Sequence, residues 1–112
     1  MILHIVRRDD WIAARSGGVY EPPSLEREGF IHFSLPDQVL RVANAWYRGE
    51  DDLVLVIVDP SRVGPELRYE EAEPGAPRFP HLYGTLDTAA VVRVLDFPEG
   101  EEGFELPVEL GV

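Results

Sequence analysis

The stretch that most constrains the fold is the run "LVLVIVD" at residues 53–59. Neighbouring side chains of a strand point to opposite faces of a sheet, so an apolar run without alternation needs cover on both faces. The run is far shorter than the roughly 20 apolar residues of a membrane span. It therefore predicts a central strand, and the remaining elements have to flank it and cover both of its faces.

Shorter strand patterns occur on both sides of this run. They cover residues 2–6, 30–34 and 66–70, a segment centred on "AVVRVL" within residues 86–97, and a short final stretch in "GFELPVEL". The acidic residues of "PEGEEGFE" are typical of a solvated turn, and "EAEPGAPRFP" predicts a loop because it contains three prolines.

Two segments have helical signals. In the first, "RDDWIAARSGG", Asp9 is a candidate N-cap and Gly17 is a candidate C-terminal stop. In the second, apolar residues follow the i, i+3, i+4, i+7 spacing of a core-facing helix, and a glycine follows them. These residues are Val39, Val42, Ala43 and Trp46, followed by Gly49. Ser34 and Asp37 resemble a capping box at its start.

The composition indicates one globular domain over residues 1–112, and the predicted elements indicate a mixed α+β fold. Hydrophobic residues make up 45% of the chain, and a chain of this size buries roughly two-thirds of its surface on folding. The net charge of −11 argues against nucleic acid as a partner, because phosphate backbones attract positive charge. No membrane span or secretory signal pattern is present, so we expect a cytoplasmic protein.

The short stretch "GFIHFS" at residues 29–34 places a histidine inside a strand pattern. Alternation puts Ile31 and Phe33 on one face, where they are expected to enter the core. It puts Phe30, His32 and Ser34 on the other face. That face is either a wet cleft or the site of a hydrogen-bonded core histidine, and the stretch alone fits both.

A candidate site emerges when the other polar strand residues are added. His4 lies in the first strand pattern, and Glu70 ends a strand on its polar face. His81 follows the proline-rich loop. Together with His32 and Ser34 these residues predict a ligand-binding cleft. Tyr20 and Tyr83 are the aromatic candidates for stacking on that ligand.

Each of these residues also has a purely structural interpretation. His4 and His32 can each be a core residue whose hydrogen bonds are satisfied within the protein. Ser34 can simply cap the following helix. Glu70 can be one solvated carboxylate among 21 acidic residues. Phe79, Pro80 and Tyr83 can serve only to pin a loop to the core. The helix face from Val39 to Trp46 is expected to be core.

A metal site is a further alternative, since imidazole and carboxylate groups bind zinc, iron or manganese. The three histidines lie in separate segments without HxH or HxxxH spacing, and the chain has no cysteine. We therefore expect no bound metal and no resident cofactor.

Three blocks of the sequence resemble a known family when taken in order and spacing. They are "WIAARSGGVY", "SLEREGFIHFSLPDQV" and "FPHLYGTL". The chain resembles the uncharacterised bacterial family called domain of unknown function 952 (DUF952), from "LHIV" to "FELP". That family is similar to a compact ADP-ribosyltransferase, which implies an ADP-ribosylation-like split antiparallel β-structure with two or three short helices.

The resemblance also implies a function. It suggests a cleft for a nicotinamide dinucleotide (NAD), with His4, His32 and Glu70 at the positions that line the site and Ser34 near them. The implied activity is ADP-ribosyl transfer or NAD cleavage, with NAD as substrate. Arg7, Arg15 and Arg78 are the candidates for the pyrophosphate. A non-enzymatic module that binds a nucleotide-like ligand or a peptide, and a metal-dependent enzyme, remain the alternatives.

Overall fold

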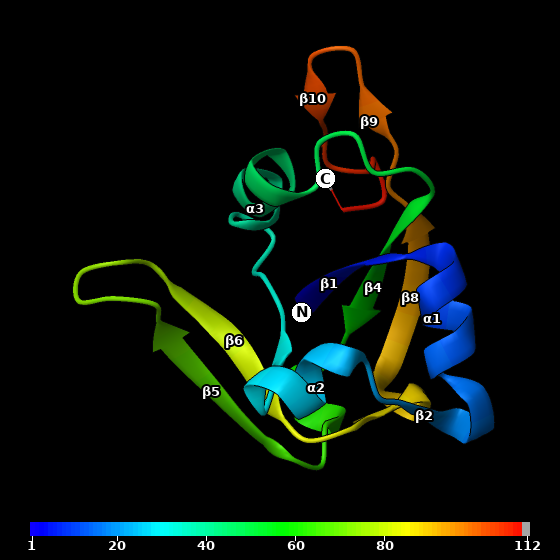
Figure 1. Ribbon diagram of the computed structural model, residues 1–112, viewed down its shortest axis with the longest axis vertical. Helices are drawn as coiled ribbons and strands as arrows, with labels where there is room; N and C mark the ends of the chain where they lie inside the picture. Colours follow the sequence, from blue (N-terminus) through cyan, green and yellow to red (C-terminus); the bar gives the residue numbers. More distant parts are fainter. Residues whose placement is uncertain (111–112) are drawn as a thin grey trace.

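The computed structural model describes residues 1–110 as an α+β arrangement of antiparallel sheets and short helices (Figure 1). The longer strands are β1 (Ile2–Arg7), β4 (Leu53–Val58), β5 (Glu66–Glu71), β6 (Arg78–Tyr83) and β8 (Val91–Asp96). The shorter ones are β2 (Val19–Tyr20), β3 (Ile31–His32), β7 (Leu86–Asp87), β9 (Glu99–Gly100) and β10 (Gly103–Phe104). The α-helices are α1 (Arg8–Ala14), α2 (Pro23–Glu28) and α3 (Val39–Trp46), and the 3₁₀ turns are η1 (Ser16–Gly18), η2 (Pro60–Arg62) and η3 (Thr88–Ala90).

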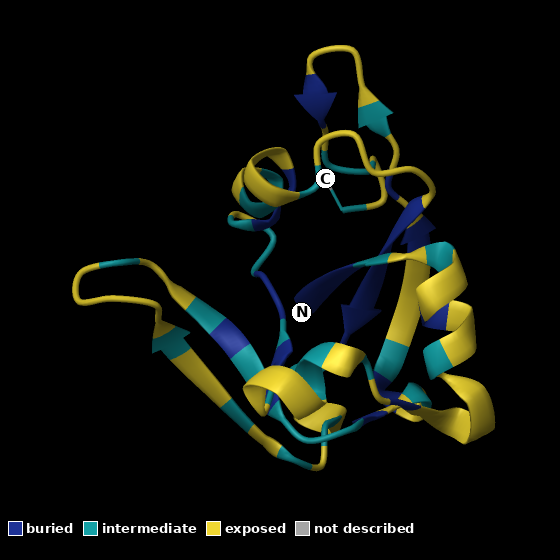
Figure 2. Cartoon of the chain, in the orientation of Figure 1, coloured by how far each residue is buried: buried dark blue, intermediate teal, exposed yellow. Residues whose placement is uncertain are grey.

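Strand β4 lies at the centre of one antiparallel sheet, between β1 and β8. All of its side chains are buried. Val54, Val56 and Val58 pack into one apolar cluster with β3 and β6 residues, whereas the alternate side chains face α3 and the β9–β10 hairpin. The prediction of a central strand covered on both faces is therefore confirmed, and Figure 2 shows β4 as one continuous buried band.

A second antiparallel sheet has the order β3-β6-β5, and Figure 1 shows its β5–β6 hairpin extending away from the rest of the molecule. The two sheets are linked by backbone hydrogen bonds in both directions between Leu3 and Ser34, at 2.8 and 2.7 Å. In this way β1 lies beside the segment that continues from β3. The coarse prediction of an α+β fold with antiparallel strands and short helices is confirmed.

The alternation predicted for "GFIHFS" is also confirmed. Ile31 and Phe33 are fully buried in the core, and His32 between them is only partly buried. The regular strand β3 contains only Ile31 and His32. Phe33 extends the pairing with β6 by donating its backbone N–H to the carbonyl of Pro80. Pro80 itself lies in β6, so the residues that were expected to end a loop are part of a strand.

Several local expectations are wrong. Helix α1 begins one residue before Asp9, so Asp9 lies in its first turn and does not cap it. Helix α3 begins at Val39 after Gln38, and neither Ser34 nor Asp37 caps it. The backbone N–H and carbonyl of Ser34 both hydrogen-bond to Leu3. Ser34 therefore forms a bridge to β1 and is not part of a helix start.

Helix α3 also differs from expectation in the residues it buries. Val39 and Ala43 enter the core as expected, but Trp46 is 79% exposed at the last position of the helix. Its ring lines a cavity that is open to solvent and does not enter the core. Within residues 1–110, no helix is long and apolar enough to cross a membrane.

Candidate functional site

A cavity of about 650 Å³ opens between α2, α3 and the β3-β6-β5 sheet. Volumes of roughly 300–1,000 Å³ are typical of small-molecule sites. The residues that line it are Leu3, His4, Ile5, Ser24, Arg27, Glu28, Phe30, His32, Ser34, Val42, Trp46, Tyr47, Glu70, Ala72, Phe79 and His81. The cavity therefore brings together His4, His32, Ser34, Glu70 and His81, five of the residues selected from the sequence.

The pairing of strands explains how these side chains meet. His32 lies directly opposite His81 in the β3–β6 ladder, with ring centroids 5.3 Å apart. Arg68 lies opposite His81 on the other side, and Glu70 is two residues further along β5 on the same face. Residues two apart on a strand share a face, so one face of the sheet carries both histidines and the carboxylate.

Glu70 and His81 form a hydrogen-bonded pair. Nδ1 of His81 lies 2.9 Å from Oε1 of Glu70, and the Tyr83 hydroxyl donates to the same oxygen. These hydrogen bonds, from Tyr83 and then His81, lower the pKa of Glu70 below its usual value. An ionised carboxylate only accepts, so Nδ1 of His81 carries the proton, and in the neutral ring Nε2 keeps its lone pair.

The His81 ring is held in place on its flat side as well. It stacks on Phe30 with a centroid distance of 4.0 Å and an interplanar angle of 16°. Its side chain is 12% exposed, compared with 34% for Glu70. An imidazole oriented by a carboxylate at one nitrogen is the arrangement that general bases use, because the other nitrogen is left to take a proton.

His32 has a different environment. Its ring lies 5.2 Å from that of Phe79, and burial lowers its pKa to about 4, with the nearby His81 acting in the same direction. The ring is therefore neutral at pH 7. A neutral imidazole offers one donor and one acceptor, so His32 can hydrogen-bond an uncharged polar group in the cavity.

His4 lines the cavity, and its ring is hydrogen-bonded within the protein. Its Nδ1 lies 2.8 Å from the main-chain oxygen of His32 and its Nε2 lies 2.7 Å from the Tyr20 hydroxyl. A carbonyl can only accept, so Nδ1–H donates to His32 and Nε2 accepts from Tyr20. Burial lowers the pKa of His4 to about 4, which keeps this arrangement neutral. Both ring nitrogens are thus engaged within the protein, and His4 positions the strand that carries His32.

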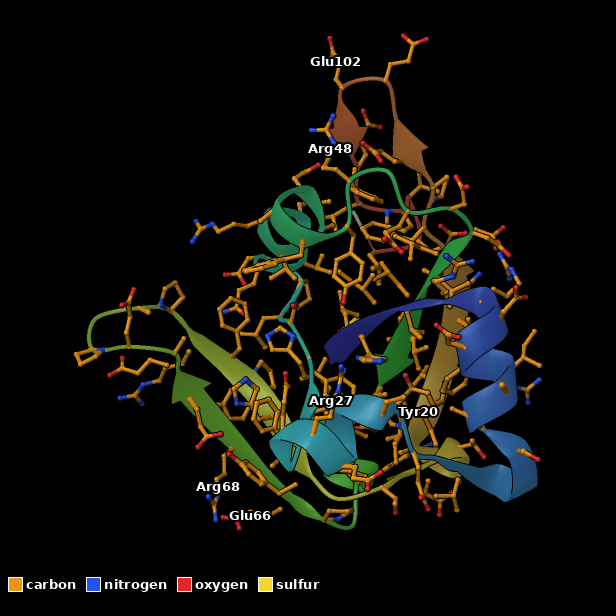
Figure 3. All side chains as sticks on the ribbon, in the orientation of Figure 1. Tyr20, Arg27, Arg48, Glu66, Arg68 and Glu102 are labelled. Carbon is orange, nitrogen blue, oxygen red and sulfur yellow. The ribbon has the colours of Figure 1, made fainter. Side chains whose placement is uncertain are left out.

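Neither of the two tyrosines expected to stack on a ligand lines this cavity. Tyr20 is fully buried, where its hydroxyl supports His4 and its ring packs on Trp11. Tyr83 supports Glu70, and the Arg68 guanidinium lies over its ring at 4.5 Å. Figure 3 shows Arg68 and its ion-pair partner Glu66 at the outer side of β5.

The three arginines considered for a pyrophosphate do not line this cavity. Arg7 lies 4.0 Å from Glu50, Arg15 lies over the Trp11 ring, and Arg78 sits at the start of β6. The cavity instead has Arg27, from α2, in its wall (Figure 3). Its sequence position, in "SLEREG", gave no signal, since only the packing of α2 beside β3 brings it to the cavity.

Aromatic side chains that the sequence did not assign to the site also line the cavity. They are Phe30, Trp46, Tyr47 and Phe79. Among residues 1–110, no group of three or more His, Cys, Asp or Glu side chains is arranged to hold a metal ion.

The fold and the cavity define a small α+β protein with a concave, aromatic site that carries three histidines and the Glu70 carboxylate. The family model described as "Protein of unknown function (DUF952)" matches residues 5–94, and the chain belongs to that family. The family expected from the three sequence blocks is therefore confirmed. No functionally curated protein matches the chain.

Solved structures similar to this chain include those of protein CC0527 from Caulobacter crescentus, a structural genomics target. Its crystal structure is 35% identical, with a TM-score of 0.86, and the match covers 99% of this chain and 98% of that one. Its solution NMR structure is 36% identical with a TM-score of 0.78, covering 92% and 89% of the two chains.

Proposed function

We propose that the cavity binds a nicotinamide dinucleotide and breaks the bond between nicotinamide and ribose, passing the ADP-ribosyl group to water or to a nucleophilic acceptor. The observation that carries this proposal is the Glu70–His81 pair, an ionised carboxylate and an oriented imidazole in the wall of one aromatic cavity. The ligand is a nucleotide-like small molecule, and the protein is a candidate ADP-ribosyl transferase or NAD glycohydrolase.

The arrangement of the sheets supports the analogy with an ADP-ribosylation-like fold. Two separate antiparallel sheets, β1-β4-β8 and β3-β6-β5, meet where Leu3 pairs with Ser34, and the cavity opens beside that junction. This is an argument by analogy, because one fold can carry unrelated functions.

The reaction places positive charge on the ribose as its bond to nicotinamide breaks, as in glycoside hydrolysis. The bonding electron pair leaves with the pyridine nitrogen, which loses its positive charge. Glu70 stabilises the charge that develops on the ribose. Water or an acceptor hydroxyl then forms a bond to the same carbon, and its proton passes to Nε2 of His81.

The two remaining histidines hold and position groups in this scheme. His32, which is kept neutral by burial, hydrogen-bonds the uncharged carboxamide or a ribose hydroxyl. His4 acts through the protein by fixing the main chain at His32. Correct placement of reacting groups supplies a large part of enzymatic rate enhancement.

A binding module without turnover is the second candidate. The observation that favours it is that Oε1 of Glu70 already accepts hydrogen bonds from both His81 and Tyr83. A carboxylate engaged in this way has less capacity to stabilise a transition state. Such a module would bind the dinucleotide and release it intact.

The experiment measures release of free nicotinamide together with calorimetric binding of the dinucleotide. The variant Glu70→Gln keeps the shape of the side chain and removes its charge. It should retain binding and lose roughly 10²–10³ in turnover, the scale for removing one electrostatic stabiliser of a transition state. The control is Glu71→Gln, which changes the next residue of β5, exposed and paired with Arg78.

Three results separate the candidates. Release that depends on Glu70 but not on Glu71 supports the enzyme. Binding without release by the wild-type protein supports the module. Absence of binding at millimolar dinucleotide contradicts both.

A further inference from the structure

A second cavity of about 550 Å³ adjoins the one that contains the Glu70–His81 pair. Five residues line both cavities, namely His4, Ile5, Ser24, Arg27 and Tyr47. Among these five, Arg27 alone carries a charge at pH 7, because burial keeps His4 neutral. The boundary between the two cavities therefore has a cationic group with an apolar and aromatic surround.

The Arg27 guanidinium has no carboxylate partner within residues 1–110. Five other arginines of this acidic chain do form ion pairs with carboxylates: Arg7, Arg8, Arg48, Arg62 and Arg68. A guanidinium has planar donors that match the oxygens of a phosphate. Arg27 thus offers an anion contact at the point where the cavities meet.

The smaller cavity is lined by more carboxylates than arginines. Asp10, Glu21 and Glu50 line it beside Tyr20, and the one other arginine there, Arg7, lies 4.0 Å from Glu50. Carboxylates repel phosphate but accept hydrogen bonds from ribose hydroxyls, which is how dinucleotide sites that exclude a 2′-phosphate work. The charge pattern fits a ligand with its anionic group in the middle and an uncharged sugar at its end.

We infer that Arg27 binds the diphosphate of a dinucleotide that spans both cavities. The nicotinamide-ribose end lies in the larger cavity and the adenosine end, without a 2′-phosphate, lies in the smaller one. The inference rests on the proposed function for the choice of dinucleotide. It assigns the ligand's two ends, its diphosphate contact and its selectivity, none of which the Glu70–His81 pair determines.

The test uses ADP-ribose, which contains the diphosphate and the adenosine but no nicotinamide to release. Calorimetric titration should show that Arg27→Gln weakens ADP-ribose binding by roughly 10–100-fold, the scale for losing hydrogen bonds between charged groups. Adenosine, which has no phosphate, should bind the variant and the wild type equally. ADP-ribose with a 2′-phosphate should bind the wild type at least about 10-fold more weakly than ADP-ribose does.

The matched control is Arg41→Gln, which removes another exposed helical arginine that lines neither cavity. It should leave all of these affinities unchanged. Thermal melts of both variants check that the fold is intact, which we expect because both side chains are exposed.

Two results would overturn the inference. In one, Arg27→Gln weakens adenosine as much as ADP-ribose, so that Arg27 only shapes the wall. In the other, ADP-ribose binds no tighter than adenosine monophosphate, so that the ligand does not span the cavities. Binding of ADP-ribose that depends on Arg27, without any nicotinamide release, would sustain this inference and refute the catalytic proposal.

Discussion

Nδ1 of His81 lies 2.9 Å from Oε1 of Glu70, across the two strands of one hairpin. The contact is diagonal, since the residue directly opposite Glu70 is Phe79 and that opposite His81 is Arg68. It exists only in one pairing register, because a slip of one residue would send one side chain to the other face. The hairpin register therefore determines the chemistry of the cavity.

Replacing Tyr83 by Phe should raise the pKa of Glu70, because the Tyr83 hydroxyl is the largest cause of its lowering. A carboxylate whose folded-state pKa is lowered stabilises the fold fully above its unfolded pKa, and that contribution disappears as the pH falls through the folded-state pKa. Tyr83→Phe should thus lose less stability than wild type on acidification below about pH 4.5, the usual value. Thermal melts from pH 7 to pH 2.5 would show this.

The control for that experiment is Tyr69→Phe. Tyr69 lies on the other face of β5 and is 46% exposed. Its melting temperatures should follow the wild-type curve at every pH. If the melting temperatures of Tyr83→Phe and wild type fall equally at acidic pH, the Tyr83 hydrogen bond does not lower the pKa of Glu70.

His4 and His32 should make the fold sensitive to mild acid. Each has a folded-state pKa of about 4, compared with the ordinary 6.5, so the unfolded chain binds more protons between these two values. The free energy of unfolding should therefore fall as the pH drops from about 6.5 to 4, with no further loss from these groups below that. His4→Gln and His32→Gln should each reduce proton uptake on unfolding by about one.

Potentiometric measurement of proton uptake in urea would check this, with the imidazole titration followed by NMR. Titration of the His4 ring near 6.5 in the folded protein would contradict its assignment as a buried neutral group hydrogen-bonded to Tyr20.

Phe33→Ala and His32→Ala should differ sharply in their effect on stability. Phe33 is fully buried, so its truncation should cost about 3–5 kcal/mol. His32 borders the cavity, and its loss should cost about 1 kcal/mol, as for an ordinary substitution. Urea denaturation of both variants measures the difference. A greater loss for His32→Ala would place that ring among the core residues.

The purified protein is expected to carry no stoichiometric first-row metal. The candidate ligands come from separate strands, and both ring nitrogens of His4 are hydrogen-bonded within the protein. Elemental analysis after gentle purification measures this. One equivalent of zinc or iron that disappears in His32→Ala would instead favour the metal-dependent alternative.

The parts of the fold that follow from local patterns could be predicted. The apolar run at residues 53–59 identified the central strand, and the alternation around His32 separated core from cavity. Trp46 shows the limit of periodicity, since helical spacing predicts which residues share a face but not which of them the core covers.

The site could be predicted only in part. The sequence selected His32, Glu70 and His81, but their contacts depend on strand register and on a hairpin that no local signal specifies. Arg27 reaches the cavity through the packing of α2 beside β3. Tyr20 was selected for its chemistry, yet its burial assigns its hydroxyl to His4. In each case the contacts of the side chain are determined by packing between segments that are far apart in the sequence.

The different burial of the two tryptophans gives the protein a built-in optical reporter. Trp11 is 6% exposed in the core, whereas Trp46 is 79% exposed and lines the larger cavity. An indole in the core is shielded from quenchers, and one in water emits at longer wavelength and is readily quenched. Changes in long-wavelength emission therefore report on the cavity, and those at short wavelength report on the core.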